Sequence, residues 1–313
     1  MKQSEFLFKD YASFLNSHFD HKVQKLSIEG GFDCPNRDGL ISHGGCTYCN
    51  NLAFTPRYCT PNDSIALQIK KGTDFFSRKY PDMKFLAYFQ AHTNTYAPLE
   101  TLKRKYEEAL DQDNIVGLIV ATRPDAIDKA TLDYLGQLAR QTFVMVEYGV
   151  ESTDENVLKN VNRGHTFAQS QAAISETAMR SIHTCAHIIL GLPGASHRQM
   201  LEEPALVSSL PIEILKLHQL QIVAHTQMAQ QYEKNPSLFT HIFASPRDYA
   251  LLAIEYIERL RPDLVIERFT SQSPDQMLIA PRWGMKNHEF VDMLKSLMRE
   301  RHTWQGRLYT TGI

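Results

Sequence analysis

The 313-residue sequence contains no apolar run long enough to span a bilayer and no large excess of either charge. A membrane-spanning helix needs about 20 consecutive apolar residues, so we expect no membrane segment. The net charge of -2 at pH 7 gives the whole chain no electrostatic attraction to nucleic acid or to anionic membranes, although it permits a local basic patch. Glycine/serine linkers, low-complexity tracts and solenoid repeats are also missing, which favours one compact unit.

Cysteine is scarce as well, with five in the whole chain. Charged residues stand among the aromatic residues of the first segment: Lys2, Glu5, Lys9 and Asp10. This mixture predicts a short N-terminal helix over residues 1–21 rather than a secretory signal peptide. We therefore expect a cytoplasmic protein, whose cysteines are free thiols or metal ligands rather than disulfides.

Apolar strand-like runs alternate with helical patterns over residues 22–225. The predicted strands are Val23–Ile28, Phe85–Phe89, Ile115–Ala121, Phe143–Tyr148, Thr184–Leu190 and Glu213–Leu220. The predicted helices between them are Ser64–Lys79, Leu99–Asp111, Ala126–Arg140, Thr166–Arg180 and Arg198–Leu210. Such alternation is typical of a parallel sheet covered by helices, and six repeats form a barrel or part of one. The fold class is therefore α/β.

The pattern after residue 225 is less regular. We predict a C-terminal extension over 226–313 that closes the open side of the barrel. It is expected to contain helices at Pro246–Leu260 and Asn287–Arg301 and one more strand at Val265–Phe269. Three polar side chains are expected to line the open side: Arg268, Gln272 and Arg282.

Three of the five cysteines lie in one glycine-rich loop after the first predicted strand. Cys34, Cys46 and Cys49 are separated by eleven and then two residues. A cubane iron–sulfur cluster normally takes four cysteine ligands, so three thiolates would leave one iron open for a small molecule. A second interpretation adds His43 and closes a zinc site of three cysteines and one histidine.

The remaining two cysteines fall outside this spacing. Cys185 lies within a predicted strand, which predicts a thiol in the core. Cys59 follows the loop and is expected to be a surface cysteine, with a second-cluster ligand or a catalytic thiol as less favoured roles.

Polar residues and glycine follow each predicted strand. In parallel α/β sheets, catalytic and binding residues lie at the edge formed by the carboxyl ends of the strands. A polar pocket is therefore expected at this edge. Lys216 and His218 are two residues apart in one strand and so share a face, which would point into the barrel. As a buried pair they would be ligands or a general acid and base, or members of a structural hydrogen-bond network.

The cysteine loop, with Tyr48 just before its last cysteine, resembles the cluster motif of the radical S-adenosylmethionine (SAM) superfamily. Three segments match, in order, the branch containing the elongator catalytic subunit and the oxygen-independent coproporphyrinogen oxidases: Gly149–Ser152, Asn162–His165 and Gly191–Gly194. Three more are similar to the YhcC-type bacterial proteins: Phe89–Thr95, Lys216–Val223 and Leu278–Pro281.

This resemblance implies a partial TIM barrel, (β/α)6, and an enzyme. Cys34, Cys46 and Cys49 would bind a [4Fe-4S] cluster, and its fourth iron would hold SAM. Reductive cleavage of SAM would produce a 5′-deoxyadenosyl radical that abstracts hydrogen from a substrate. Flavodoxin or ferredoxin is the type of electron donor implied.

Residue types at the strand ends fit the parts of SAM. Arg163 offers a planar fork for its carboxylate, Glu151 accepts from the ribose hydroxyls, and Gln90 and Thr93 offer oxygens to the amino group. The adenine is expected to lie among four residues: Tyr48, Leu192, Gln221 and Val223. Gly191 lets the backbone come close. His187, which stands where the oxidases carry an acid, is a further candidate. Three residues are predicted to face the reaction chamber: His92, Lys216 and His218.

A small-molecule substrate, such as a metabolite or a tetrapyrrole-like compound, is favoured slightly. A base of tRNA or another RNA is the alternative, and it is disfavoured because the chain shows no appended RNA-binding domain and no net positive charge. A non-catalytic zinc-binding scaffold protein is the third hypothesis.

Overall fold

The computed structural model describes residues 6–77, 82–240 and 243–310 of the chain. Seven parallel strands form one curled sheet with the order β1-β2-β3-β4-β5-β6-β8. Their bounds are Val23–Ile28 (β1), Lys84–Phe89 (β2), Ile115–Thr122 (β3), Phe143–Glu151 (β4), His183–Leu190 (β5), Ile214–Gln219 (β6) and Val265–Arg268 (β8). The predicted α/β partial TIM barrel is therefore confirmed, and the further strand predicted at Val265–Phe269 joins its sheet as β8.

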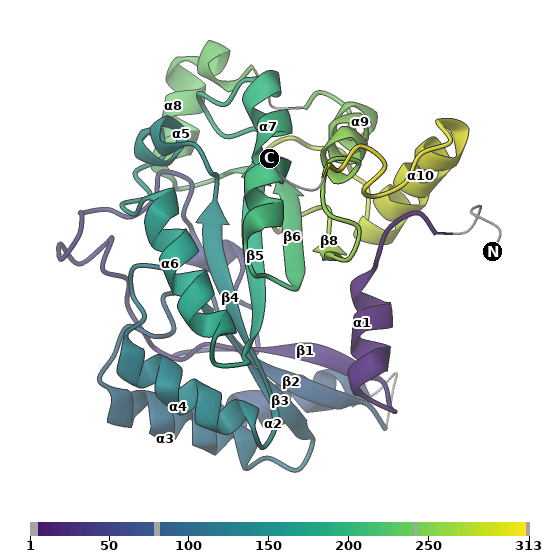
Figure 1. The fold of residues 1–313 in the computed structure, drawn as a ribbon. Helices are drawn as coiled ribbons and strands as arrows, with labels where there is room; N and C mark the ends of the chain where they lie inside the picture. The colour runs from purple at the N-terminus through teal and green to yellow at the C-terminus, as the bar shows by residue number, and fades with distance from the viewer. Residues whose placement is uncertain (1–5, 78–81, 241–242, 311–313) are drawn as a thin grey trace.

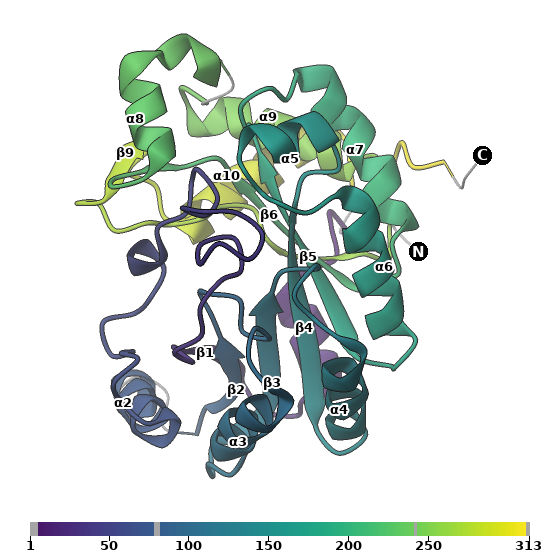
Figure 2. The ribbon, with the colours of Figure 1, turned by 90° about the vertical axis from the view of Figure 1, so that its left-hand side faces the viewer.

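Helices cover the outer face of the sheet, as Figures 1 and 2 show. They are α2 (Ile65–Ser77), α3 (Leu99–Leu110), α4 (Lys129–Ala139), α6 (Phe167–Ala178) and α7 (His197–Ser209). Thr166 and Ser196 begin α6 and α7 with capping boxes, because each hydroxyl accepts from the backbone three residues on and each glutamine side chain reaches back. The predicted end of the second helix at Lys79 lies outside the described residues.

The inner face of the sheet differs between its two ends. At the amino end it is apolar, because Met145, Ile214 and Val265 pack around Phe14 of α1 (Tyr11–His18). Helix α1 therefore covers the amino end of the half-barrel interior, and it does not cover the carboxyl end. The observed helix α1 is shorter than the N-terminal helix predicted over residues 1–21, of which residues 1–5 lie outside the described part.

The C-terminal third supplies α8 (Gln227–Lys234), α9 (Pro246–Ile257), α10 (Asn287–Glu300) and an antiparallel ribbon of β7 (Ile222–Val223) and β9 (Leu278–Ala280). Its strand β8 pairs with β6, so this segment shares the barrel's own sheet. The short helix α5 (Glu155–Asn160) was not predicted. In the described ranges, every helix is too short or too polar to cross a membrane.

Candidate functional site

A cavity of about 660 Å³ opens at the carboxyl edge of the sheet, between the strand ends and the cysteine loop. Many predicted site residues line it: Cys34, Cys46, Tyr48, Cys49, Gln90, His92, Thr93, Glu151, Arg163, His187, Lys216 and His218. Four predicted SAM contacts are not in its lining: Gly191, Leu192, Gln221 and Val223. The fold thus brings together side chains from the cysteine loop, from the turn after β2, from the segment after α5, and from β4, β5 and β6.

The cysteine loop is fastened to the segment that follows α5. Asn36 donates its side-chain amide to the carbonyl of Asn162 at 2.7 Å, and Asn162 donates its own amide to the carbonyl of Gly45 at 2.8 Å. The backbone N–H of Thr47 donates to the carbonyl of Val161 at 2.9 Å. Because these bonds are made by buried or half-buried groups, the loop is held in one position over the cavity.

All three cysteines of the loop are free thiols, and Cys46 is buried while Cys34 and Cys49 are half-buried. The Cys46 sulfur accepts from the Arg163 guanidinium at 3.4 Å and from the Asn36 amide at 3.6 Å. Such donors stabilise the thiolate form that ligates a metal. The donor set, three thiols at a cavity rim with hydrogen bonds already directed at one sulfur, fits an iron–sulfur cluster.

The zinc interpretation fits less well. Zinc holds thiolate ligands at about 2.3 Å, so its ligand atoms must crowd together. Over the described ranges, the one set of three metal-binding side chains whose ligand atoms lie within 4.8 Å of one another is Glu147, Cys185 and Glu267. The three loop cysteines and His43 are therefore not gathered around a single-ion position. A cluster spreads its ligands over separate iron atoms and does not need them so close.

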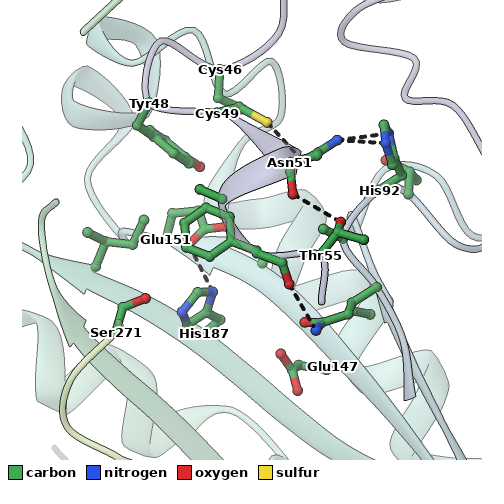
Figure 3. Close-up of a pocket in the computed structure, with 18 of the residues that line it drawn as sticks. Cys46, Tyr48, Cys49, Asn51, Thr55, His92, Glu147, Glu151, His187 and Ser271 are labelled. Carbon is green, nitrogen blue, oxygen red and sulfur yellow. Dashed lines mark hydrogen bonds and ion pairs between the residues drawn. The ribbon is translucent and has the colours of Figure 1, made fainter. Parts of the chain in front are cut away.

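Glu151 ends β4 at an irregular point of the strand. The pairing with β5 shifts between Gly149 and Glu151, and Glu151 adopts the left-handed backbone with φ of 70°, a conformation that costs energy in a residue with a side chain. Its carboxylate lies 3.5 Å from the Arg163 guanidinium. It also lies 3.4 Å from Nδ1 of His187, as Figure 3 shows. Burial raises the pKa of Glu151, and the positive charge of Arg163 opposes part of this effect.

Several buried polar atoms of the cavity-lining side chains have no hydrogen-bond partner within the described part of the chain. They are Tyr48 OH, Glu151 Oε2, Arg163 Nε and His187 Nε2. Arg163 is otherwise well held, because its NH2 donates to the carbonyl of Gly149 at 2.6 Å. Unpartnered buried polar groups are rare in folded proteins and costly. This cluster therefore indicates a surface prepared for a polar ligand.

Two imidazoles share the next part of the wall. The rings of His187 and His218 lie 4.4 Å apart between centroids. Burial lowers the pKa of both, that of His218 to about 3, so both are neutral near pH 7. Nδ1 of His218 lies 2.8 Å from the carbonyl oxygen of Gln219 and must carry the proton, because a carbonyl only accepts. Its Nε2 is then a hydrogen-bond acceptor.

His92 and Gln90 follow β2 on the other side of the cavity. The side-chain amide of Asn51, in the 3₁₀ helix Asn51–Ala53, lies 2.9 Å from the His92 ring, and burial lowers the pKa of His92. Gln90 donates to the hydroxyl of Ser27 at 2.8 Å. Thr93 is buried in the turn that follows.

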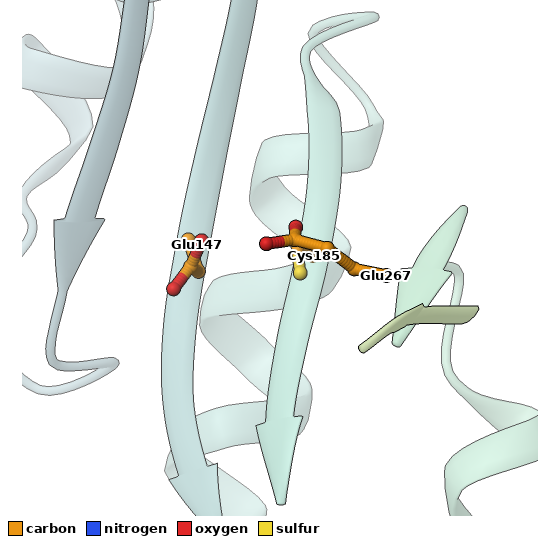
Figure 4. A group of neighbouring side chains, drawn as sticks. All are labelled: Glu147, Cys185 and Glu267. Carbon is orange, nitrogen blue, oxygen red and sulfur yellow. The ribbon is translucent and has the colours of Figure 1, made fainter. Parts of the chain in front are cut away.

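Lys216 lies deeper, in a network of four charges. It donates to Glu147 and lies 3.4 Å from Glu267, while Lys25 lies 3.3 Å from Glu147 and 2.6 Å from Glu267. Burial alone would raise the pKa of Glu147, but the two ammonium groups outweigh it and hold this pKa well below its usual range. In Figure 4 the side chain of Cys185 lies beside the carboxylate of Glu267, and the carboxylate of Glu147 lies on the neighbouring strand β4. Because two lysines neutralise two glutamates, this group needs no metal ion.

Some expectations need correction. Cys59 is buried rather than exposed, and its thiol donates to the carbonyl of Ser27 at 3.0 Å. Arg282 is exposed and does not line the cavity, whereas Arg268 and Gln272 do. Cys185 is a core thiol as predicted.

The four predicted residues outside the cavity lining have other surroundings. Leu192 and Val223 are buried in the core, and Gly191 has φ of 93° in the turn after β5. The Gln221 amide donates to the carbonyl of Ser271 at 3.1 Å and accepts from the hydroxyl of Ser273 at 2.8 Å. Their contacts with adenine stay predictions.

Sequence reasoning missed several residues. Asn36, which bonds to Cys46 and Asn162, lies two positions after Cys34, and that nearness was the only signal for it. Ser271 and Ser273 line the cavity from the loop after β8, on either side of Gln272, which was the one residue of this loop predicted there.

Two family models match the chain. The radical SAM superfamily model covers residues 38–203, more than half of the chain, and the Radical_SAM C-terminal domain model covers residues 212–300. The chain belongs to the radical SAM superfamily. Its members use a [4Fe-4S] cluster and SAM. Cys46 and Cys49 lie within the first matched range, and Cys34 precedes it.

Relatives within the radical SAM superfamily confirm the narrower resemblance. Protein YhcC of Escherichia coli is 36% identical over 270 residues, which cover 86% of this chain and 85% of that protein. The uncharacterized protein YtqA of Bacillus subtilis is 35% identical over 295 residues, covering 94% and 90%. A tRNA uridine(34) acetyltransferase of Dehalococcoides mccartyi is 26% identical over 228 residues, covering 61% and 49%.

A solved structure shows the same fold. The archaeal Elp3 of Methanocaldococcus infernus superimposes with a TM-score of 0.68 at 13% identity. The superposition covers 91% of this chain and 64% of the Elp3 chain, so this protein spans slightly less than two thirds of that structure.

Proposed function

We propose that this protein is a radical SAM enzyme in which Cys34, Cys46 and Cys49 hold a [4Fe-4S] cluster. The observation that carries the proposal is the position of these three free thiols at the rim of a polar cavity on the carboxyl edge of the sheet. When bound and reduced, the cluster supplies the electron that splits SAM into methionine and the hydrogen-abstracting 5′-deoxyadenosyl radical.

Arg163 is proposed to connect the cluster loop with the SAM position. Its guanidinium already donates to Cys46 and to the carbonyl of Gly149, and its buried Nε has no partner. This free donor suits the carboxylate of SAM. Glu151, whose Oε2 also lacks a hydrogen bond, is proposed to accept from the ribose hydroxyls. Gln90 and Thr93 are proposed to face the amino group.

The residues predicted for the reaction chamber have different freedom. The pKa values of His218 and His92 are lowered by burial, so both rings are neutral near pH 7 and each can accept a hydrogen bond. The ammonium of Lys216 is paired with two carboxylates at the base of the cavity. It is proposed to hold this part of the cavity in place and to contact the substrate. The electron donor is proposed to be a flavodoxin or ferredoxin of the cytoplasm, where free thiols persist.

The test is cluster assembly and SAM cleavage by anaerobically purified protein. We expect iron and acid-labile sulfide, broad visible absorption, and 5′-deoxyadenosine after reduction in the presence of SAM. Cys34→Ala, Cys46→Ala and Cys49→Ala should each lose these signals. Cys59→Ser is the matched control, because Cys59 lies outside the cavity lining and serine keeps a donor for the carbonyl of Ser27. One zinc per chain without visible absorption would contradict the proposal.

A small-molecule substrate is supported by the cavity, whose volume lies in the range of small-molecule sites. A tRNA base is the second candidate, favoured by the similarity to the tRNA uridine(34) acetyltransferase. Filter binding of bulk tRNA at increasing salt separates the two. Binding that weakens steeply with salt is the mark of phosphate contacts and would select the RNA substrate, whereas no binding would select the small molecule.

A further inference from the structure

Arg268 faces the interior of the half-barrel because β8 contains a bulge. Val265 belongs to the apolar cluster around Phe14 inside the half-barrel, whereas Ile266 belongs to the core on the other face of the sheet. Glu267 therefore points inward, toward Lys216. Regular alternation along the strand would then turn Arg268 outward. However, the pairing of β6 with β8 slips by one residue at this point, and Arg268 lies opposite the inward-facing Lys216. An extra residue in one strand re-aims the next side chain. Arg268 consequently lines the cavity.

The guanidinium of Arg268 has no hydrogen-bond or ion-pair partner among the residues that the structure describes, and its Nε is buried. The nearby carboxylates are already paired. Glu267 is shared by Lys25 and Lys216, and Glu151 lies beside Arg163. A half-buried cation without a partner is costly. Its presence therefore indicates that a negative charge binds here from outside the chain.

The groups around Arg268 leave this positive charge uncompensated. Burial lowers the pKa of His218 and of His187, and the charge of Arg268 lowers both further, so neither ring adds charge near pH 7. The loop after β8 forms the adjacent wall, and Gln219 holds it with a paired amide contact to Ser271, at 3.2 Å and 3.1 Å. A wall fixed in advance lowers the entropy cost of binding.

We propose that Arg268 binds a carboxylate of the substrate, so that the substrate is an organic acid or carries an acidic group on a larger molecule. This inference rests on the proposed function. The planar guanidinium matches a carboxylate with two parallel hydrogen bonds. Arg37 and Arg57 also line the cavity, but both are exposed to water, so Arg268 is the lining cation that is at least half-buried and without a partner among the described residues. One such cation balances one negative charge, whereas a phosphate monoester carries about −1.5 to −2. Arg163, bonded to Cys46 and Gly149, is a separate cation.

The experiment is calorimetric titration of anaerobically reconstituted, SAM-saturated holoenzyme with glutarate, its neutral diamide glutaramide, and inorganic phosphate. We expect wild type to bind glutarate in preference to phosphate and not to bind glutaramide. Arg268→Gln should weaken glutarate binding by about tenfold or more, because it removes charge-assisted hydrogen bonds. Arg268→Lys keeps the charge but not the planar guanidinium, so its glutarate affinity should lie between those of wild type and Arg268→Gln. Arg282→Gln, with the same charge change outside the cavity, should match wild type.

SAM affinity is measured in the same variants. Equal SAM affinity in wild type and Arg268→Gln is the expected result, and loss of SAM binding would assign Arg268 to SAM and overturn the proposal. It is also overturned if wild type does not bind glutarate, binds phosphate more tightly, or binds glutarate no better than Arg268→Gln does. Failure of the proposed function shows separately, as absent iron and absent 5′-deoxyadenosine in wild type. The tRNA-binding measurement then distinguishes a free acid from an acidic group on RNA.

Discussion

Glu203 is a buried carboxyl group that supports the end of β4. One of its oxygens accepts from the backbone N–H of Thr153 at 2.8 Å and from the hydroxyl of Ser152 at 3.1 Å, and the other accepts from Tyr256 at 3.1 Å. Ser152 and Thr153 directly follow Glu151, so Glu203 on α7 holds the backbone beside the cavity. Burial raises the pKa of Glu203 to about 7, although these hydrogen bonds oppose the shift.

This raised pKa makes stability depend on pH. Between pH 4.5 and about pH 7 the folded protein keeps the Glu203 proton that the unfolded chain loses. The free energy of unfolding therefore falls as pH rises through this window, by about 3 kcal/mol in all. Glu203→Gln, which stays neutral and keeps the shape, should flatten the slope. Urea unfolding across the window measures it, with the exposed Glu202→Gln on the same helix as control. Equal slopes in Glu203→Gln and wild type would refute this account.

The cysteine loop depends on a second loop for its position. Gly164, which follows Arg163, has φ of 83°, and a Cβ atom there would lie 2.5 Å from the side-chain oxygen of Asn36. Asn36 in turn bonds to Cys46 and Asn162. The element that would carry the cluster is thus packed directly on a position that only glycine can occupy without strain.

Gly164→Ala should therefore lower both stability and cluster content. The left-handed backbone alone costs about 1–2 kcal/mol with a Cβ, and the contact with Asn36 adds to it. Gly284→Ala is the matched control, because Gly284 has φ of 63° but open space where a Cβ atom would lie. Urea unfolding and iron per chain are measured for both. If the two variants retain equal iron, the contact with Asn36 does not position the cysteine loop.

At the scale of the whole molecule, the buried charges connect the two edges of the sheet. Lys25 lies on β1 and Glu267 on β8, the first and last strands in the sheet order, and their 2.6 Å contact spans the barrel interior. Glu147 and Lys216 complete the network from β4 and β6. Its net charge is zero, so the curled sheet is held across its open side by paired groups.

Removing one charged group from this network should lower the free energy of unfolding substantially. Lys25→Met leaves two buried carboxylates beside one ammonium, and such changes cost about 3–5 kcal/mol. The double variant Lys25→Met/Glu267→Gln restores the charge balance and should recover part of the loss. Lys103→Met breaks a surface pair with Glu100 and should cost about 1 kcal/mol or less. Urea unfolding of the three variants measures these free energies. If Lys25→Met lowers the free energy of unfolding no more than Lys103→Met does, the buried charge network does not hold the sheet together.

The α/β order of strands and helices, the cysteine loop and the polar strand ends follow from the amino-acid sequence alone, because periodicity and residue spacing are local properties. Leu215 and Leu217 against Lys216 and His218 illustrate this, since alternation in one strand was enough to place them on opposite faces. For the same reason, the sequence alone predicts most of the residues proposed for the cluster and SAM, and most of these line the same cavity.

Which of these side chains remain without a partner depends on how the chain folds. The bulge that turns Arg268 inward arises from the pairing of β8 with β6, about fifty residues away in the chain, and single-strand alternation cannot reveal it. Lys216 finds its carboxylates on β4 and β8, and Cys59 is covered by packing against β1. These outcomes depend on contacts between distant segments, which residue spacing along the chain does not encode.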